Sequence, residues 1–262
     1  MSFIKIGKCF KMNSKNITLP RFTMKLIIDI GNSRAKFFVF DEENIVYSTI
    51  IDNSQLGKLS LPYAHCIDSG IICNVSNIEN VNIISQFSNI KFTIFTHETP
   101  IPIQIRYKTP QTLGLDRIAA AVGATSISGN TNKLVIDLGT AITIDFINEN
   151  NEFVGGNISL GMNSRFRALH EFTGKLPLCS ASETTTLTGQ DTFEAIQNGV
   201  ILGICQELDG YIDSYSSQYQ NLTTFLTGGD CLFFEKRLKN HIFAQQNLVA
   251  LGLNTILKYN EE

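Results

Sequence analysis

The chain has 262 residues, and its 21 lysines and arginines against 24 aspartates and glutamates give a net charge of −3. A chain of this length can bury a large core and divides most simply into two domains. The weak negative charge excludes the basic surface with which proteins bind nucleic acid or anionic membranes, so the sequence predicts a small-molecule partner.

Cysteine usage and hydropathy favour a cytoplasmic protein. No apolar run approaches the roughly 20 residues that span a bilayer. Residues 1–23 carry basic residues but no acid, and Met24 directly precedes the first apolar run. We therefore expect Met24 to be the natural start, and residues 1–23 to be a poorly ordered or artefactual extension. Six scattered cysteines, without a C-x-x-C pair, fit neither a disulfide framework nor a zinc site: Cys9, Cys66, Cys73, Cys179, Cys205 and Cys231.

The first patterned stretch, residues 25–40, predicts a β-hairpin. An apolar run delivers Asp29 to the end of a strand, Gly31 begins a turn, and residues 35–40 return antiparallel. Three strands followed by alternating helices and strands indicate a ribonuclease-H-like domain rather than a purely parallel sheet. After the hairpin we expect a strand over 44–51, a helix over 55–59, a strand within 66–75, a helix over 81–87 and a strand over 91–95.

Residues 134–146 repeat the first hairpin, with Asp137 at the end of an apolar strand and Gly139 at the turn. The sequence therefore predicts an α/β protein of two duplicated ribonuclease-H-like domains, residues 24–127 and 128–262. Later elements are expected as helices over 162–172, 190–215 and 248–257 and a strand over 222–226.

Both hairpin turns have the composition of a phosphate site. Asp29 and Asp137 would repel phosphate unless a cation stood between them, so they imply a metal–nucleotide ligand. Either turn alone would favour an ordinary hairpin, whereas the occurrence of two copies, each with an aspartate at the end of an apolar strand, favours the nucleotide. Glycine lets backbone N–H groups approach an anion, and side-chain donors are added by Asn32, Ser33, Thr140 and Thr143.

The segment between the hairpins, residues 107–117, is predicted as a structured loop running into an alanine-rich helix over 118–124. Asp116 falls near the helix start, where an acid is favourable as an N-cap, and Arg117 is compatible with a solvated position. Their place between two phosphate hairpins makes both candidate functional residues. Further on, the glycines of 155–161 indicate close approach of a ligand or backbone, or a bulge, and 227–230 fits an adenosine edge or a simple turn.

Five motifs in register resemble type III pantothenate kinases. They are D-I-G-N-S-R-A-K (29–36), G-L-D-R (114–117), D-L-G-T-A-I-T-I-D (137–145), G-G-N-I-S-L-G (155–161) and T-G-G-D (227–230). The resemblance spans Met24 to the C-terminus and implies the actin-like ATPase fold of the acetate and sugar kinase, heat-shock chaperone ATPase and actin superfamily. It also implies a homodimer that phosphorylates pantothenate with ATP, the first step toward coenzyme A, using magnesium and a monovalent cation, potassium or ammonium.

The resemblance assigns roles residue by residue. Asp116 would be the catalytic base and Asp137 the potassium ligand. Ser33, where threonine is usual, keeps the hydroxyl, whereas Leu160, where proline is usual, alters the turn. The ATP phosphates and magnesium would contact Asp29, Ile30, Gly31, Asn32, Ser33, Arg34, Ala35 and Lys36, with Thr140 also touching ATP. Pantothenate would contact Tyr107, Gly114, Leu115, Asp116, Arg117 and Thr192.

Two other functions are compatible with phosphate hairpins: a kinase of another small alcohol or carboxylate, and a nucleotide-binding regulator. The G-L-D-R loop favours pantothenate, and Asp116 favours an enzyme. In phosphoryl transfer the protein mainly positions the reactants and neutralises charge, and direct in-line transfer is the expected route. In that reaction Asp116 would orient the pantothenate hydroxyl and take its proton late.

Overall fold

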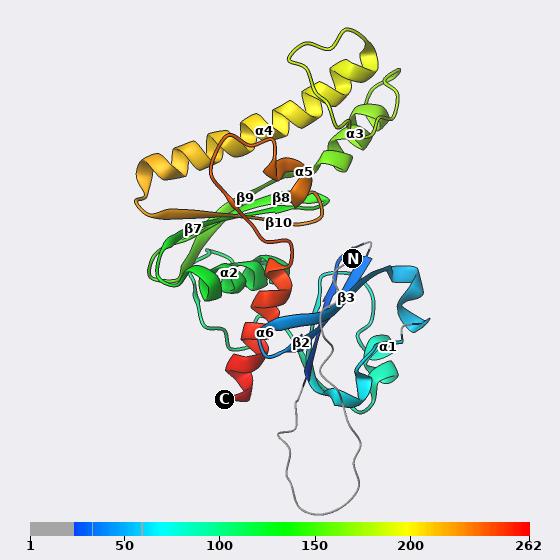
Figure 1. Ribbon diagram of the computed structural model, residues 1–262, viewed down its shortest axis with the longest axis vertical. Helices are drawn as coiled ribbons and strands as arrows, with labels where there is room; N and C mark the ends of the chain where they lie inside the picture. The colour runs from blue at the N-terminus through cyan, green and yellow to red at the C-terminus, as the bar shows by residue number, and fades with distance from the viewer. Residues whose placement is uncertain (1–23, 33, 59) are drawn as a thin grey trace, which may run out of the picture.

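The computed structural model describes residues 24–32, 34–58 and 60–262. The expectation for residues 1–23 lies outside these ranges. Two mixed sheets dominate the molecule, and helices connect them and cover their faces (Figure 1).

The two sheets share one strand order. In the first, β3-β2-β1-β4-β5, the strands are β1 (Met24–Ile30), β2 (Arg34–Asp41), β3 (Asn44–Asp52), β4 (Ile67–Asn74) and β5 (Lys91–Ile94). The second contains β7 (Asn132–Leu138), β8 (Ala141–Ile147), β9 (Glu152–Leu160), β10 (Leu222–Thr227) and β11 (Phe243–Ala244), with β6 (Gln104–Ile105) added beyond β9. In both sheets an antiparallel meander is followed by two parallel strands. This repetition confirms the predicted duplicated ribonuclease-H-like fold.

The helices are distributed unequally between the two sheets. A long helix covers the outer face of the second sheet, at the top of Figure 1. The α-helices are α1 (Val81–Ile84), α2 (Leu115–Ser128), α3 (Met162–Glu171), α4 (Thr192–Gln218), α5 (Cys231–Glu235) and α6 (Leu248–Glu261). Within the described ranges no helix has both the length and the apolarity that crossing a bilayer requires.

Most of the predicted elements are confirmed with shifted ends. Residues 53–58 form a 3₁₀ helix rather than the α-helix expected from 55, and 81–87 divides into α1 and a 3₁₀ turn. Helix α2 begins at Leu115, earlier than the apolar run indicated. The elements that were missed, β6, β11 and α5, have two to five residues, too few to carry a periodic pattern.

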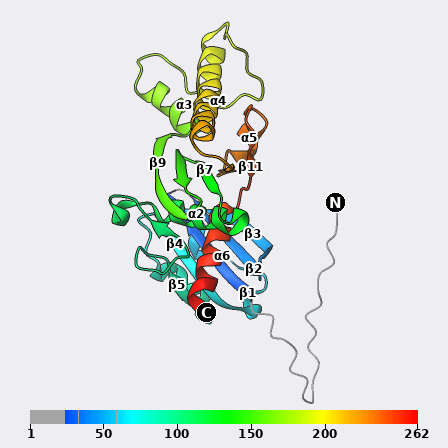
Figure 2. The ribbon, with the colours of Figure 1, turned by 90° about the vertical axis from the view of Figure 1, so that its left-hand side faces the viewer.

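Helices α2 and α6 join the two sheets into one core. From Arg117 to Ala124 every residue of α2 is buried, as expected for a helix with protein on all sides. The two helices cross at small residues, because a Cβ on Gly123 or Gly252 would collide with the backbone of the other helix. Helix α6 also lies along β1 and β4 of the first sheet (Figure 2). One apolar cluster therefore contains side chains of both sheets.

The chain crosses between the halves more than once. Strand β6 precedes residue 127 yet pairs with β9 in the second sheet, and α6 follows residue 128 yet packs on the first. The two sheets therefore do not divide at residue 127, and the predicted domains, residues 24–127 and 128–262, stay a prediction.

Candidate active site

The first hairpin ends with a nearly buried carboxylate. Asp29 is the penultimate residue of β1 and stands opposite Lys36 of β2. The Lys36 Nζ lies 3.7 Å from Asp29 Oδ2, and Asp29 is only 8% exposed. The turn between the strands is closed by a 3.0 Å hydrogen bond from the Gly31 N–H to the Arg34 carbonyl. The pair thus places one carboxylate and one ammonium beside a glycine turn.

The second hairpin presents Asp137 in the corresponding place, near the end of β7. Its turn is held from two directions. The Thr140 carbonyl accepts hydrogen bonds from the Gly161 N–H at 3.0 Å and from Ser164 Oγ at 2.7 Å, both at the start of α3. On the other side Gly228, with φ of 93°, lies so close that a Cβ there would collide with the Asp137 carboxylate.

The start of α2 supplies a third carboxylate. Gly114 is the N-cap of this helix, and Asp116 lies in its first turn, where Oδ1 accepts a 2.9 Å hydrogen bond from the Arg117 N–H. The expectation that Asp116 might serve as the N-cap is wrong, because the helix begins one residue before it. Asp116 is half-buried. Its carboxylate is therefore placed by the first turn of the helix, where one oxygen also accepts a backbone N–H.

Arg117 is held by a buried ion pair. Its guanidinium is 7% exposed and bonds the carboxylate of Asp145 in β8, with Nε 3.1 Å from each oxygen. The guanidinium carbon lies 5.9 Å from the Tyr107 ring centre and 5.8 Å from that of Phe153, within cation–π range. Arg117 is therefore not the solvated residue that sequence alone allowed.

The ion pair between Arg117 and Asp145 explains why β9 has a glycine at position 156. A Cβ on Gly156 would collide with Asp145 and lie 2.9 Å from Arg117 Nη2. The sequence allowed either close approach of another group or a bulge, and close approach applies at Gly156. The bulge lies nearby, where the pairing of β8 with β9 shifts register between Phe146 and Ile147. Asp145 and Gly156 were within recognised motifs but had no assigned role. An acid in the middle of an apolar strand was the signal for a buried partner.

The three carboxylates share one electrostatic environment. Burial raises the pKa of Asp137 to about 7; Lys36 opposes this shift, and the charges of Asp116, Asp29 and Asp145 add to it. Burial also raises the pKa of Asp29, again against Lys36 and with a contribution from Asp116. The charges of Asp116 and Asp29 thus reach Asp137, and that of Asp116 reaches Asp29, so the carboxylates share a region with an excess of negative charge. Such a place attracts cations.

The described residues do not form a closed metal cage. Among them, no three His, Cys, Asp or Glu side chains are grouped so that they could hold a metal ion. A hard divalent ion bound at Asp29 would therefore complete its shell with water or with oxygens of a bound anion, as Mg²⁺ commonly does with phosphates. The donor chemistry of Asp29 fits such an ion.

The structure brings together most of the predicted site residues, although not all by their side chains. The charges of Lys36 and Asp116 influence the pKa of both Asp29 and Asp137, which links these four side chains electrostatically. Ile30 and Ala35 are fully buried in the first core, so only their backbone can face a ligand. Arg34 is exposed and pairs with Asp52, and Ser33 lies outside the described residues. Around the start of α2 are grouped Tyr107, Gly114, Leu115 and Arg117.

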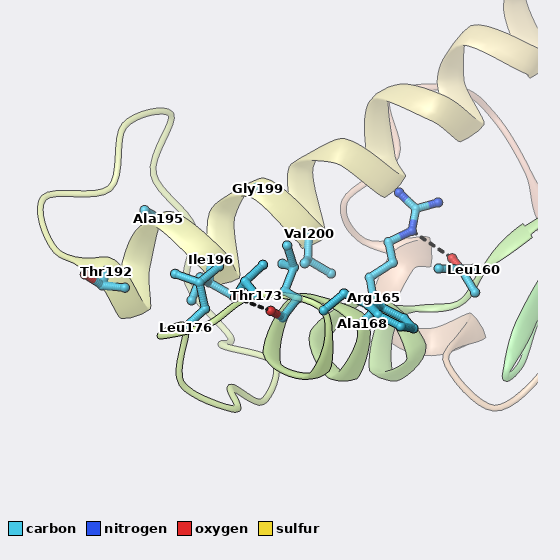
Figure 3. A pocket seen from close by; sticks show the side chains of 12 residues that line it. Leu160, Arg165, Ala168, Thr173, Leu176, Thr192, Ala195, Ile196, Gly199 and Val200 are labelled. Atoms are coloured by element: carbon cyan, nitrogen blue, oxygen red, sulfur yellow. Dashed lines mark hydrogen bonds between the residues drawn. The ribbon is translucent and has the colours of Figure 1, made fainter.

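Thr192 does not join this group. It lies at the start of α4, on the face of the second sheet opposite to Arg117, and lines a separate pocket of about 830 Å³ (Figure 3). The pocket lies between α3 and α4 and its lining is mostly apolar. Its one charged residue, Arg165, bonds the Leu160 carbonyl at 2.7 Å and pairs with Glu207. This pocket lacks the groups for phosphoryl transfer.

Comparison with known proteins assigns this arrangement to a family. The family model "Type III pantothenate kinase" matches residues 25–214. Curated relatives of that name include one from Phocaeicola vulgatus, 45% identical over 91% of this chain and 100% of its own, and one from Flavobacterium johnsoniae, 38% identical over 90% and 98%.

Solved structures agree with the fold. A Baf family protein of Campylobacter jejuni has a TM-score of 0.62 and 25% identity over 90% of this chain and 98% of its own. A ROK family glucokinase from Streptomyces griseus has a TM-score of 0.50 at 12% identity, over 90% and 98%, which bears on the fold alone.

The raised pKa of Asp137 predicts a pH-dependent stability. Its folded-state pKa of about 7 lies above the ordinary 3.8, so the folded protein holds a proton that the unfolded chain releases. The free energy of unfolding should fall by up to about 1.4 kcal/mol per pH unit between about pH 4 and pH 7. In buffer without alkali or divalent cations, Asp137→Asn should remove this slope. Its melting temperature should exceed that of the wild type by a margin that grows from pH 5 to pH 7 and then levels off.

The control is Asp68→Asn, which neutralises an exposed carboxylate of β4. A constant difference in melting temperature between Asp137→Asn and the wild type across this pH range would show that Asp137 is ionised throughout, contrary to the prediction.

Proposed function

The chain belongs to the type III pantothenate kinase family and catalyses the ATP-dependent phosphorylation of pantothenate in coenzyme A biosynthesis; we propose that the carboxylate cluster of Asp29, Asp116 and Asp137 is its active site. The observation that supports this proposal is that these three acids, from two hairpins and a helix start, share one electronegative region, in which the charges of Asp116 and Asp29 raise the pKa of Asp137. An excess of negative charge suits a ligand that arrives as a complex with cations.

ATP and a divalent metal ion are the cofactors that a kinase of this family requires. We assign the metal to the Asp29 carboxylate, where it neutralises charge on the triphosphate. Lys36 lies 3.7 Å from the same carboxylate and places a second positive charge beside the phosphates. The turn residues Gly31, Asn32 and Ser33, together with Thr140, are assigned to phosphate contact. This division of labour matches a reaction that depends on positioning and electrostatics.

Asp116 is proposed as the catalytic base. Its half-buried carboxylate is part of the cluster and forms no ion pair among the described residues, whereas Asp145 is paired with Arg117. A carboxylate accepts the hydroxyl proton of pantothenate only when the new bond to phosphorus has begun to form, because a free alcohol is a very weak acid. Tyr107, Gly114, Leu115 and Arg117 surround the position proposed for pantothenate.

Replacing Asp116 tests this role. Asp116→Asn should lower kcat about 10²-fold or more, the usual contribution of a general base, while the dissociation constant for ATP stays near that of the wild type. ADP release in the presence of pantothenate measures the first quantity and calorimetry the second. Asp68→Asn is the matched control and should keep full activity, and near-normal turnover in Asp116→Asn would assign the base to another group.

We further propose that Asp137 binds a monovalent cation, potassium or ammonium. The charges of Asp116, Asp29 and Asp145 all act on its carboxylate, which lies against the backbone of Gly228. Carbonyl and carboxylate oxygens of this kind suit a hard, weakly held cation. Potassium and a proton would then compete for the same carboxylate.

This competition has a measurable consequence. The potassium concentration that gives half-maximal kinase activity should be about tenfold higher at pH 6 than at pH 8, because the pKa of Asp137 lies near 7. Asp137→Asn should show no saturable response to potassium at either pH. An unchanged potassium curve in that variant would place the ion elsewhere.

A homodimer is proposed from the outer face of the second half. Large apolar side chains stand exposed on β9, just after α3 and at the start of α4, an arrangement typical of an interaction surface. They include Phe172 (85% exposed), Ile158 (64%), Phe193 (55%) and Leu160 (52%). Thr192 lies on this same surface and far from the Asp116 of its own chain, so we propose that it serves the pantothenate site of the partner subunit.

A cytoplasmic location is proposed as well, since Cys73, Cys205 and Cys231 are buried reduced thiols.

Heterodimers of two inactive chains test the shared site. Asp116→Asn and Thr192→Arg, co-expressed with different tags and purified through both, should form dimers in which one of two sites has neither substitution. Such heterodimers should recover about half of the wild-type kcat per dimer, while each homodimer stays nearly inactive. Heterodimers no more active than the homodimers would show that Thr192 and Asp116 act within one chain.

A further inference from the structure

The junction between β3 and the 3₁₀ helix that follows it lies beside the first phosphate turn. Arg34, where β2 begins, pairs with Asp52, where β3 ends. The residue after Asp52 lies close to Gly31 and Asn32 of the first turn. This residue is Asn53, which belongs to none of the motifs.

The Asn53 side chain holds the turn by its backbone. Its Nδ2 donates hydrogen bonds to two successive carbonyl oxygens, 2.9 Å to Gly31 and 3.1 Å to Asn32. A side-chain amide has two N–H donors, so one group satisfies both acceptors. The only other bond within the turn is that of the Gly31 N–H to Arg34, among the described residues. Asn53 thus connects the backbone of this turn to the end of β3 through its side chain.

These bonds set the direction of the peptide group between Gly31 and Asn32. In a trans peptide the C=O and N–H point to opposite sides. Because the Gly31 carbonyl is drawn toward Asn53, the Asn32 N–H is turned away from Asn53. Without this contact, the peptide could rotate and present its carbonyl, an electronegative end, where a donor is needed.

The chemistry of the amide matters as much as its position. Asn53 neutralises two carbonyl dipoles with hydrogen-bond donors and brings no net charge into a region already rich in carboxylates. A carboxylate of the same shape would set acceptors against acceptors and add charge close to a polyanion. An amide is therefore the side chain that can hold this turn without disturbing the electrostatics of the site.

We propose that Asn53 is a positioning residue for the triphosphate, acting through the carbonyls of Gly31 and Asn32 on the N–H donors of the first turn. The inference rests on the proposed function of that turn. It predicts a defect limited to ligands that carry phosphates, since the bonds of Asn53 reach no other part of the site.

The test compares Asn53→Asp and Asn53→Ala with the wild type. Asn44→Asp is the matched control for Asn53→Asp, because Asn44 is exposed at the far end of β3, the strand that Asn53 follows, and the charge change is identical. Kinetics gives KM for ATP and for pantothenate, and adenosine is used as a competitive inhibitor that lacks phosphates. Both Asn53 variants should raise KM for ATP about tenfold or more, as the loss of two hydrogen bonds implies. The inhibition constant of adenosine and KM for pantothenate should change less than about twofold, as in the control.

Each other outcome overturns the proposal. An unchanged KM for ATP would show that the turn keeps its geometry without Asn53. A parallel weakening of ATP and adenosine would show a general structural role. Asp29→Asn separates this inference from its premise: if that variant binds ATP as tightly as the wild type, the assignment of the first turn to phosphate fails, whatever Asn53 does.

Discussion

Repulsion between carboxylates that the fold holds near one another is the constraint on which the proposed site depends. Asp29, Asp116 and Asp137 come from separate elements, yet the charges of Asp116 and Asp29 raise the pKa of Asp137, the charge of Asp116 raises that of Asp29, and Lys36 opposes both shifts. A protein keeps such groups together only where the surrounding fold holds them rigidly and where a ligand later neutralises them. A triphosphate with its cations meets that requirement, and the same excess of charge that weakens the empty site gives affinity for the loaded one.

The scaffold supplies the rigidity through close backbone contacts. Gly161 and Gly228 let α3 and the end of β10 press against the second turn, and Gly123 and Gly252 let α2 and α6 cross with almost no gap. Because α2 starts at the carboxylate cluster and packs between both sheets, the position of Asp116 is tied to both hairpins at once. The buried Arg117–Asp145 pair fixes the same helix to β8. Removing one partner of such a pair typically costs about 3–5 kcal/mol, so it also anchors the site structurally.

Much of this arrangement was predictable because it is encoded locally. Apolar runs ending in Asp29 and Asp137 predicted both strands and both turns, and their duplication predicted two sheets of the same order. The contacts of Asp145 and Asn53 were not predictable in this way. Arg117 is 28 residues from Asp145 in the sequence and Gly31 is 22 residues from Asn53, and each pair meets only because of the strand register. The early start of α2 was also missed, because Asp116 and Arg117 interrupt the apolar pattern for reasons that lie outside the helix.

By itself, the sequence determined the fold class, the two glycine turns and the acidic residues that end their strands, because each depends on neighbours within a few positions. Tertiary structure alone decided which acids are neutralised and which remain available. Asp145 is neutralised by its ion pair with Arg117, whereas Asp116 forms no ion pair among the described residues, a difference that residue spacing does not predict. It also decided that Thr192 lies on the opposite face from Arg117. Charge interactions and sheet faces depend on distances in space, and those exist only once the chain has folded.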